Sequence, residues 1–110
     1  MFLRQLGVGN TNGGLPFRPI ARAFIGAEGT VLAGMYEGLT VLPRIGANQY
    51  EITTNRVFDP FRCIPAVYLA SFTNGQIDAV VWDENTIIVL TYDGAGVADE
   101  RGFNIIVWVF

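Results

Sequence analysis

Few side chains in this chain have the chemistry of a catalytic group. There is no histidine among the 110 residues, so the commonest general base and a leading metal ligand are missing. The single cysteine, Cys63, has no histidine that could hold it as a reactive thiolate and no second cysteine for an internal disulfide. We therefore interpret Cys63 as a plain buried thiol.

Two pairs of neighbouring carboxylates are the best candidates for acid–base chemistry. Asp83-Glu84 and Asp99-Glu100 fall in predicted turns, where adjacent side chains point apart and are solvated. Glycoside hydrolysis instead needs two carboxylates that face each other across a cleft. A glycan hydrolase is therefore the least favoured of three functional hypotheses, and turnover of a polysaccharide would revive it.

A glycine-rich segment, Asp93-Gly-Ala-Gly96, has a weak likeness to a calcium loop. It lacks the spaced Asp and Asn ligands and the terminal glutamate that bind calcium. We predict no catalytic residues, no cofactor and no bound metal, and hence a protein that is not an enzyme.

Four aromatic residues of the second half of the chain could offer a flat surface to a sugar ring. They are Trp82, Tyr92, Trp108 and Phe110. Such rings also pack in cores and at interfaces, and we favour that interpretation.

The elements that would position these residues are short strands. From about residue 18 onward, apolar runs alternate with turn-forming residues, a spacing typical of an all-β sandwich or barrel. The expected strands span 20–25, 30–35, 39–44, 49–54, 64–72, 77–83, 86–92 and 103–110. Asn74-Gly75 is the strongest hairpin signal, because both residues tolerate the positive φ of a type I′ turn. We predict a single antiparallel β-sandwich, jelly-roll-like, with about eight short strands.

The first 17 residues differ from the rest. Residues 7–14 are rich in glycine and asparagine and have no hydrophobic periodicity, while apolar residues lie on either side. This composition predicts an extended N-terminal arm over 1–17, followed by the sandwich domain over 18–110. The arm residues expected to contact a neighbouring protein are Phe2, Leu3, Leu15 and Phe17.

The last three expected strands are apolar on both faces. In the strand over 86–92, Ile87 and Val89 occupy one face while Ile88 and Leu90 occupy the other. A sandwich strand normally turns one face to solvent, so something must cover the second apolar face. The cover is either the chain's own arm and loops or a neighbouring subunit, and we favour the subunit. The residues expected at that subunit interface are Trp82, Ile87, Val89, Ile106, Trp108 and Phe110.

The composition is consistent with burial against another protein. Charged residues make up 15% of the chain, against about 25% in typical soluble domains. The net charge is −3 and the chain contains no lysine, so it lacks the basic stripe that nucleic acid or an anionic membrane would attract. No apolar run approaches the roughly 20 residues of a membrane-spanning helix, and the N-terminus has no secretory signal. We expect no nucleic acid and no membrane among its partners, and synthesis in a cytoplasm.

Three stretches of the chain are similar to a known family. They are 23–31, which ends in Gly29-Thr30-Val31, then 39–53, which contains Tyr50-Glu-Ile52-Thr53, and 96–110, in which Asp99 precedes the closing apolar strand. From Ala21 to the C-terminus the chain resembles a small β-rich domain that recurs in virion proteins of tailed bacteriophages, often at the ends of tail fibres. It departs from the family at Asn48, where glycine is expected, at the apolar segment around Trp82, and in the absence of a long fibre shaft before the domain.

The resemblance implies a structural protein of the virion, commonly a homotrimer, that assembles in the host cytoplasm. The leading hypothesis is a capsid decoration (cement) protein that stabilises the head, with the major capsid protein or a tail protein of the same virus as its partner. The alternative is a tail-fibre or spike module that contacts the host receptor or another tail protein through loops 93–102 or 73–76. The family supplies no catalytic residues.

Overall fold

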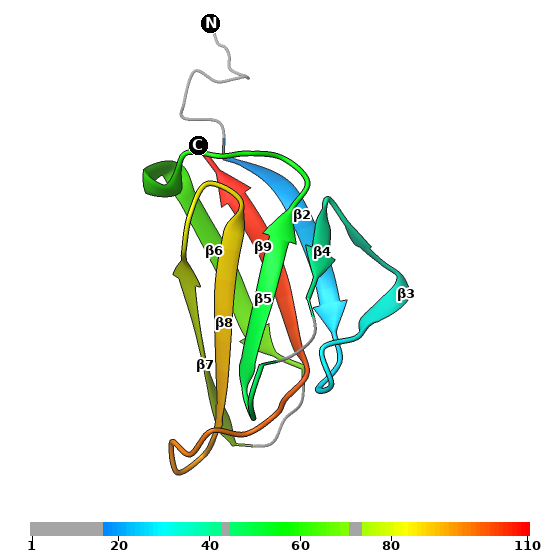
Figure 1. Cartoon of the computed structure of the whole chain (residues 1–110), viewed down its shortest axis with the longest axis vertical. Coiled ribbons are helices and arrows are strands. Elements are labelled where there is room, and N and C mark those ends of the chain that lie inside the picture. Colours follow the sequence, from blue (N-terminus) through cyan, green and yellow to red (C-terminus); the bar gives the residue numbers. More distant parts are fainter. Residues whose placement is uncertain (1–16, 43–44, 71–73) are drawn as a thin grey trace, which may run out of the picture.

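The computed structural model describes residues 17–42, 45–70 and 74–110. Within them, eight strands form two antiparallel sheets that pack face to face (Figure 1). Sheet I has the order β3 (Val31–Glu37), β2 (Arg18–Ile25), β9 (Phe103–Val109), β6 (Cys63–Leu69). Sheet II has the order β4 (Leu39–Val41), β5 (Gln49–Thr54), β8 (Thr86–Asp93), β7 (Gly75–Val81). The predicted all-β sandwich of about eight short strands is confirmed.

The chain changes sheets repeatedly. Consecutive strands pair in three places, β2 with β3, β4 with β5, and β7 with β8, and the other connections cross between the sheets. One crossing, from β5 to β6, contains the short 3-10 helix η1 (Pro60–Arg62), which Asp59 caps by accepting a hydrogen bond from the backbone N–H of Phe61 at 2.9 Å. Gly38, between β3 and β4, has φ +76°, and a side chain there would collide with the backbone of Ile20.

The expected hairpin at Asn74-Gly75 is corrected by the pairing of the strands. Gly75 is the first residue of β7, which pairs with β8, whereas the preceding strand β6 pairs with β9 in the other sheet. The segment therefore connects the two sheets, and Gly75 is not among the glycines with positive φ. Turn chemistry showed that the chain bends here but not which strand it would meet.

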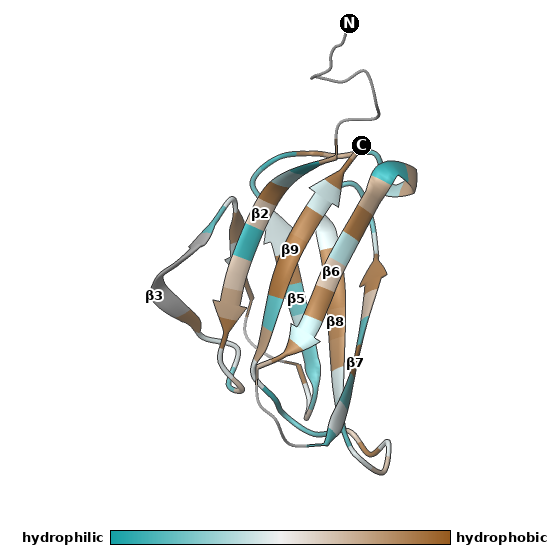
Figure 2. Cartoon of the chain, turned by 180° about the vertical axis from the view of Figure 1, so that it is seen from behind, coloured by the Kyte–Doolittle hydropathy of each residue, from teal (hydrophilic) through white to brown (hydrophobic). Residues whose placement is uncertain are grey.

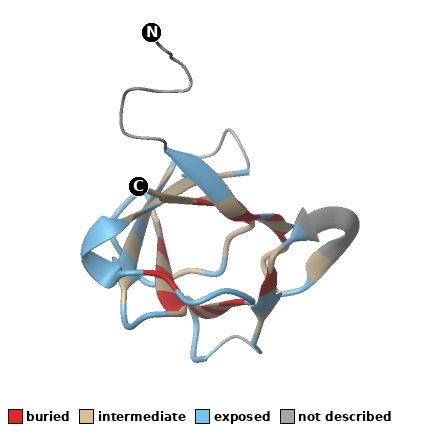
Figure 3. Cartoon of the chain, turned by 90° about the horizontal axis from the view of Figure 1, so that it is seen from above, coloured by how far each residue is buried: buried red, intermediate tan, exposed pale blue. Residues whose placement is uncertain are grey.

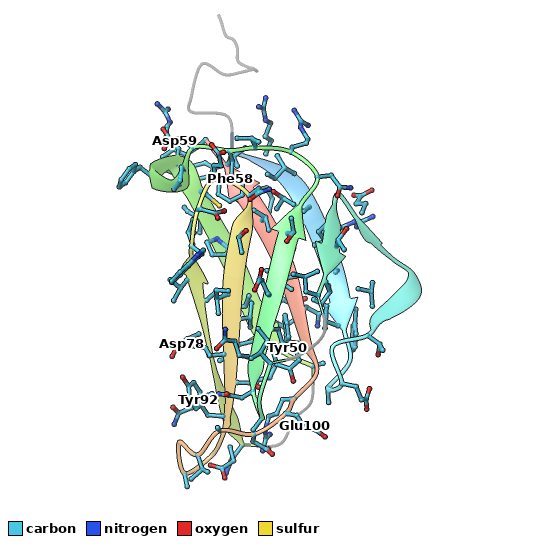
Figure 4. All side chains as sticks on the ribbon, viewed as in Figure 1. Tyr50, Phe58, Asp59, Asp78, Tyr92 and Glu100 are labelled. Atoms are coloured by element: carbon cyan, nitrogen blue, oxygen red, sulfur yellow. The ribbon has the colours of Figure 1, made fainter. Side chains whose placement is uncertain are left out.

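Alternate residues of the strands point inward and form one core between the sheets (Figure 3). The largest fully buried side chains are Tyr50, Phe103, Ile25, Ile52, Ile87, Ile105, Val89 and Val107. The rings of Tyr50 and Phe103 meet edge to face across the sandwich, with centroids 5.0 Å apart. The hydroxyl of Tyr50, labelled in Figure 4, donates a hydrogen bond to the carbonyl of Ala27 at 2.7 Å and accepts one from the N–H of Arg101 at 3.1 Å. Tyr50 thus ties two connections to the core.

Two residues expected at a subunit interface belong to this core instead. Ile87 and Val89 have no exposed surface, because β8 turns them toward sheet I. The opposite face of β8 carries the partly exposed Ile88 and Leu90. The expectation that this strand has two apolar faces stands, but the two faces were assigned the wrong way round.

Candidate interaction surfaces

The outer face of sheet I carries neighbouring apolar side chains from three strands. The registers of β2, β9 and β6 align outward side chains in three rows across the sheet. The rows are Pro19–Trp108–Ile64, Arg22–Ile106–Ala66 and Phe24–Asn104–Tyr68. We call these nine residues the apolar face, and Figure 2 shows the three strands β2, β9 and β6 that carry it side by side.

Several of its side chains remain open to solvent in the single chain. Ile64 is 45% exposed and Tyr68 is 56% exposed, while Ile106 and Trp108 are half-buried. The single charged residue of the apolar face is Arg22, which forms an ion pair at 3.0 Å with Glu37 of β3. A surface of this composition is typical of contact with another protein chain.

The structure brings together three of the predicted interface residues. Ile106 and Trp108 lie in the apolar face, and Phe110 follows directly at the end of β9. Sequence reasoning missed Phe24, Ile64 and Tyr68, which complete the rows from β2 and β6. Their strands carried an apolar pattern, but only the pairing with β9 places their side chains beside Ile106 and Trp108.

The end of the sandwich next to Phe110 combines aromatic and basic side chains. Phe17, predicted as an arm contact to the capsid, packs on Phe110 with ring centroids 5.0 Å apart, although it remains 53% exposed. Arg62 donates from its Nε to the main-chain oxygen of Phe110 at 2.7 Å and lies 5.6 Å from the centroid of its ring. Phe17 therefore belongs with the folded domain, while the other predicted arm contacts, Phe2, Leu3 and Leu15, lie outside the described residues.

Three arginines surround a hollow of about 230 Å³ at the same end. Arg18, Arg56 and Arg62 line it together with Asp59 and Phe58. Guanidinium groups gathered in this way suit the carboxylates of a partner protein.

The outer face of sheet II carries a groove of about 530 Å³. Its lining is partly apolar and partly polar, and it includes no basic residue. The lining residues are Gln49, Glu51, Val80, Trp82, Asp83, Thr86, Ile88 and Leu90, and we call this hollow the Trp82 groove. Trp82 is 71% exposed and directly follows β7 of sheet II, whereas Ile106 and Trp108 belong to β9 of sheet I. The predicted interface residues therefore do not form one surface.

The carboxylate pairs lie in connections between strands, as the sequence predicts. Asp83 and Glu84 follow β7, where Asp83 accepts a hydrogen bond from the N–H of Asn85 at 3.0 Å. Asp99 forms an ion pair with Arg101 at 3.0 Å in the connection from β8 to β9. Each pair is thus engaged locally, and the two pairs lie at opposite ends of β8 (Figure 1).

Two ionisable groups have a shifted pKa. Burial raises the pKa of the Cys63 thiol to about 11, which keeps it protonated and unreactive near neutral pH. Hydrogen bonds from the N–H groups of Val97 and Ala95 lower the pKa of Asp93, whose carboxylate closes the turn after β8. Both shifts fit structural roles.

The described residues contain no cluster of three or more His, Cys, Asp or Glu side chains that could hold a metal ion. Within the same residues, no helix has the length and hydropathy to cross a membrane. No protein-family model, no curated protein and no solved structure matches the chain. The resemblance to bacteriophage virion domains therefore rests on the residues of the chain alone.

Proposed function

We propose that this protein is a non-enzymatic structural protein of a tailed-bacteriophage particle, which forms a homotrimer and decorates the capsid as a cement protein. The observation that carries the proposal is the apolar face of sheet I. The family resemblance supplies the virion, and the apolar face supplies a physical reason for assembly.

Burial of the apolar face would be strongly favourable. Each large apolar side chain that passes from water into a contact gains about 1.5–3 kcal/mol when fully covered. Ile64 and Tyr68 are exposed, and Ile106 and Trp108 are half-covered, so the gain is spread over the whole face. Arg22 already has a partner in Glu37, so the contact would not bury an unpaired charge.

The symmetry of a trimer limits which surfaces take part. A three-fold interface is heterologous, so each copy uses two different patches, and the patches must flank a shared axis. The outer faces of sheets I and II point in opposite directions, and pairing one with the other would build an open stack instead of a ring. The apolar face must therefore meet a neighbouring edge or end of the next copy, which leaves the Trp82 groove outside the trimer contact.

The mass of the full-length protein in solution tests the trimer. Light scattering after size exclusion should give three times the mass of the chain. Ile106→Lys, in the middle of the apolar face, should yield a folded monomer, because it would bury a second positive charge opposite Arg22, which already pairs with Glu37. Val80→Lys is the matched control, since Val80 is 47% exposed on the outer face of sheet II, and it should leave the trimer intact. A monomeric wild-type protein would contradict the proposal.

Binding to capsids tests the cement role separately. Removing residues 1–16 spares Phe17 and its contact with Phe110, so the domain should keep its fold. The truncated protein should no longer sediment with capsids that lack the decoration protein, because Phe2, Leu3 and Leu15 are gone. If the truncated protein still sedimented with these capsids as fully as the full-length protein, the arm would not be the capsid contact.

A second candidate function is a fibre or spike module that contacts the host. The observation that favours it is the open Trp82 groove, which the fold does not fill. Substitutions there should reduce adsorption of the virus to cells and leave the heat stability of the particle unchanged. A loss of particle stability instead would favour cement.

A further inference from the structure

The Trp82 groove has a regular construction that follows from strand register. In sheet II, Ile88 of β8 lies opposite Glu51 of β5 on one side and Val80 of β7 on the other. Leu90 lies opposite Gln49 in the neighbouring row. The middle of the groove is therefore an apolar strip along β8, and β5 forms a polar wall beside it.

Trp82 closes the other side of the groove. Its indole is 71% exposed, more than expected for the residue that has the most apolar area to bury. The backbone of Trp82 is held, since its N–H donates to the carbonyl of Thr86 at 2.9 Å. The backbone of Trp82 is thus fixed, whereas its ring is exposed to solvent.

The polar wall has unused hydrogen-bonding capacity. Within the described residues, neither the amide of Gln49 nor the carboxylate of Glu51 takes part in a side-chain hydrogen bond. Together with Asp83 at the Trp82 end, they offer acceptors and one donor on both sides of an apolar floor.

We propose that the Trp82 groove is a binding site for a neutral oligosaccharide. A sugar ring has an apolar C–H face that stacks on an indole and on aliphatic side chains, and a rim of hydroxyls that bond to carboxylates and amides. The volume of about 530 Å³ lies within the usual 300–1,000 Å³ range of small-ligand sites. The hydroxyls would meet Glu51, Gln49 and Asp83 while one ring stacks on Trp82.

The lining suits a neutral ring better than a charged ligand. An anionic ligand would face Glu51 and Asp83 with no basic residue in the groove to balance them. A cation would be attracted by these two carboxylates, but the apolar strip along β8 offers it no contact. A neutral ring uses both the apolar strip and the carboxylate acceptors.

The inference goes beyond the proposed function and does not depend on it. The groove and the apolar face lie on opposite sheets, so sugar binding and trimer formation can fail separately.

The two tryptophans provide the test in the full-length protein. In nitrogen-labelled protein, the two indole N–H signals are followed during titration with maltotriose, cellotriose and triacetylchitotriose, three neutral trisaccharides that differ in linkage or in the substituent at C2. The expected result is a saturable shift of the Trp82 signal with at least one of them, while the Trp108 signal stays in place. Trp82→Ala should lower the affinity at least tenfold, Glu51→Gln should lower it severalfold, and Trp108→Phe should leave it unchanged.

Three results would overturn the proposal. In the first, none of the trisaccharides shifts the Trp82 signal, or a trisaccharide shifts the signals of other residues in Trp82→Ala as much as it does in the wild type. In the second, a trilysine peptide moves the Trp82 signal where the sugars do not, which would reassign the groove to cations. In the third, the trisaccharide is cleaved during the titration, seen by chromatography, which would make the groove a catalytic site and not only a binding site.

Discussion

The outer faces of the two sheets differ in composition, although the central strand of each sheet has a similar apolar sequence. On sheet I the three rows of outward residues are almost wholly apolar, and the one charge, on Arg22, is paired. On sheet II an apolar strip along β8 is bordered by Gln49 and Glu51, and Trp82 stands exposed beside it. The first face has the composition of a protein contact, and the second has the mixed composition of a ligand site.

The difference arises from the strands that flank the central ones. β8 and β9 are both apolar on their outer sides, with Ile88 and Leu90 on one and Ile106 and Trp108 on the other. β9 lies between β2 and β6, which add Phe24, Ile64 and Tyr68. β8 lies between β5 and β7, which add amide and carboxylate side chains. A similar apolar strand thus becomes part of two different surfaces.

The largest expected effect separates the inside of β8 from its outside. Ile87→Ala should lower the free energy of unfolding by about 2–5 kcal/mol, because Ile87 is fully buried and its removal leaves a cavity. Ile88→Ala, one residue away on the outer face, should cost about 1 kcal/mol or less. Urea unfolding followed by circular dichroism measures both. Equal costs would mean that the inner and outer faces of β8 are not as the structure describes.

These neighbouring isoleucines also show what the sequence could and could not predict. Period-two alternation divides β8 into two faces, and the bounds that the sequence predicts for the strand over 49–54 are those of β5. Because both faces of β8 are apolar, no pattern within the strand indicates which one meets the core. That choice depends on the position of sheet I, which is set by residues far away in the chain.

The same limit applies to the candidate sites. The sequence groups Trp82 with Trp108 because both belong to expected strands that are apolar on both faces. Their strands belong to different sheets, which follows from the pairing of β7 with β8 and of β9 with β2 and β6. The groove also needs Glu51 and Gln49 from β5, and the alternation within that strand indicates a polar outer side but not a ligand site.

A second prediction compares one tryptophan from each outer face. Trp108→Ala should lower the free energy of unfolding by about 1–3 kcal/mol, since Trp108 is half-buried and lies opposite Pro19 and Ile64 on the neighbouring strands. Trp82→Ala should change it by no more than about 0.5 kcal/mol, because the ring is largely exposed. Urea unfolding of both variants is followed by circular dichroism instead of fluorescence, because each variant lacks one of the two tryptophans. A cost at Trp82 as large as that at Trp108 would argue that the indole packs on its own domain.

A third prediction contrasts two tyrosines of sheet II. Tyr50→Phe removes the hydroxyl that links Ala27 and Arg101, so it should lower the free energy of unfolding by about 1 kcal/mol. Tyr92→Phe, on the outer side of β8, should have almost no effect, since no hydrogen bond of its hydroxyl is present among the described residues. Thermal unfolding of both variants gives the comparison. If Tyr92→Phe proved the costlier change, the outer face of sheet II would have a contact that the single chain does not contain.

The smallest expected effect concerns the pH dependence of stability, for which Asp93 at the end of β8 is compared with Asp78 on the outer face of sheet II. The pKa of Asp93 is lowered from its ordinary 3.8 by hydrogen bonds from the Val97 and Ala95 N–H groups, so its ionised form is favoured in the folded state. The resulting stabilisation is present above about pH 3.8 and is lost as the pH falls through the lower folded pKa. Asp93→Asn should therefore reduce the loss of stability on acidification from neutral pH, measured by urea unfolding at several pH values.

Asp78→Asn provides the control for this measurement. Asp78 extends from the outer face of β7, and no hydrogen bond or ion pair holds its carboxylate among the described residues. Acidification should then destabilise Asp78→Asn as much as the wild type. If Asp78→Asn removed more of the pH dependence than Asp93→Asn, the carboxylates of the outer face would be engaged in the folded protein. They would then be less free to meet the hydroxyls of a bound sugar, and the contrast between the two outer faces would narrow.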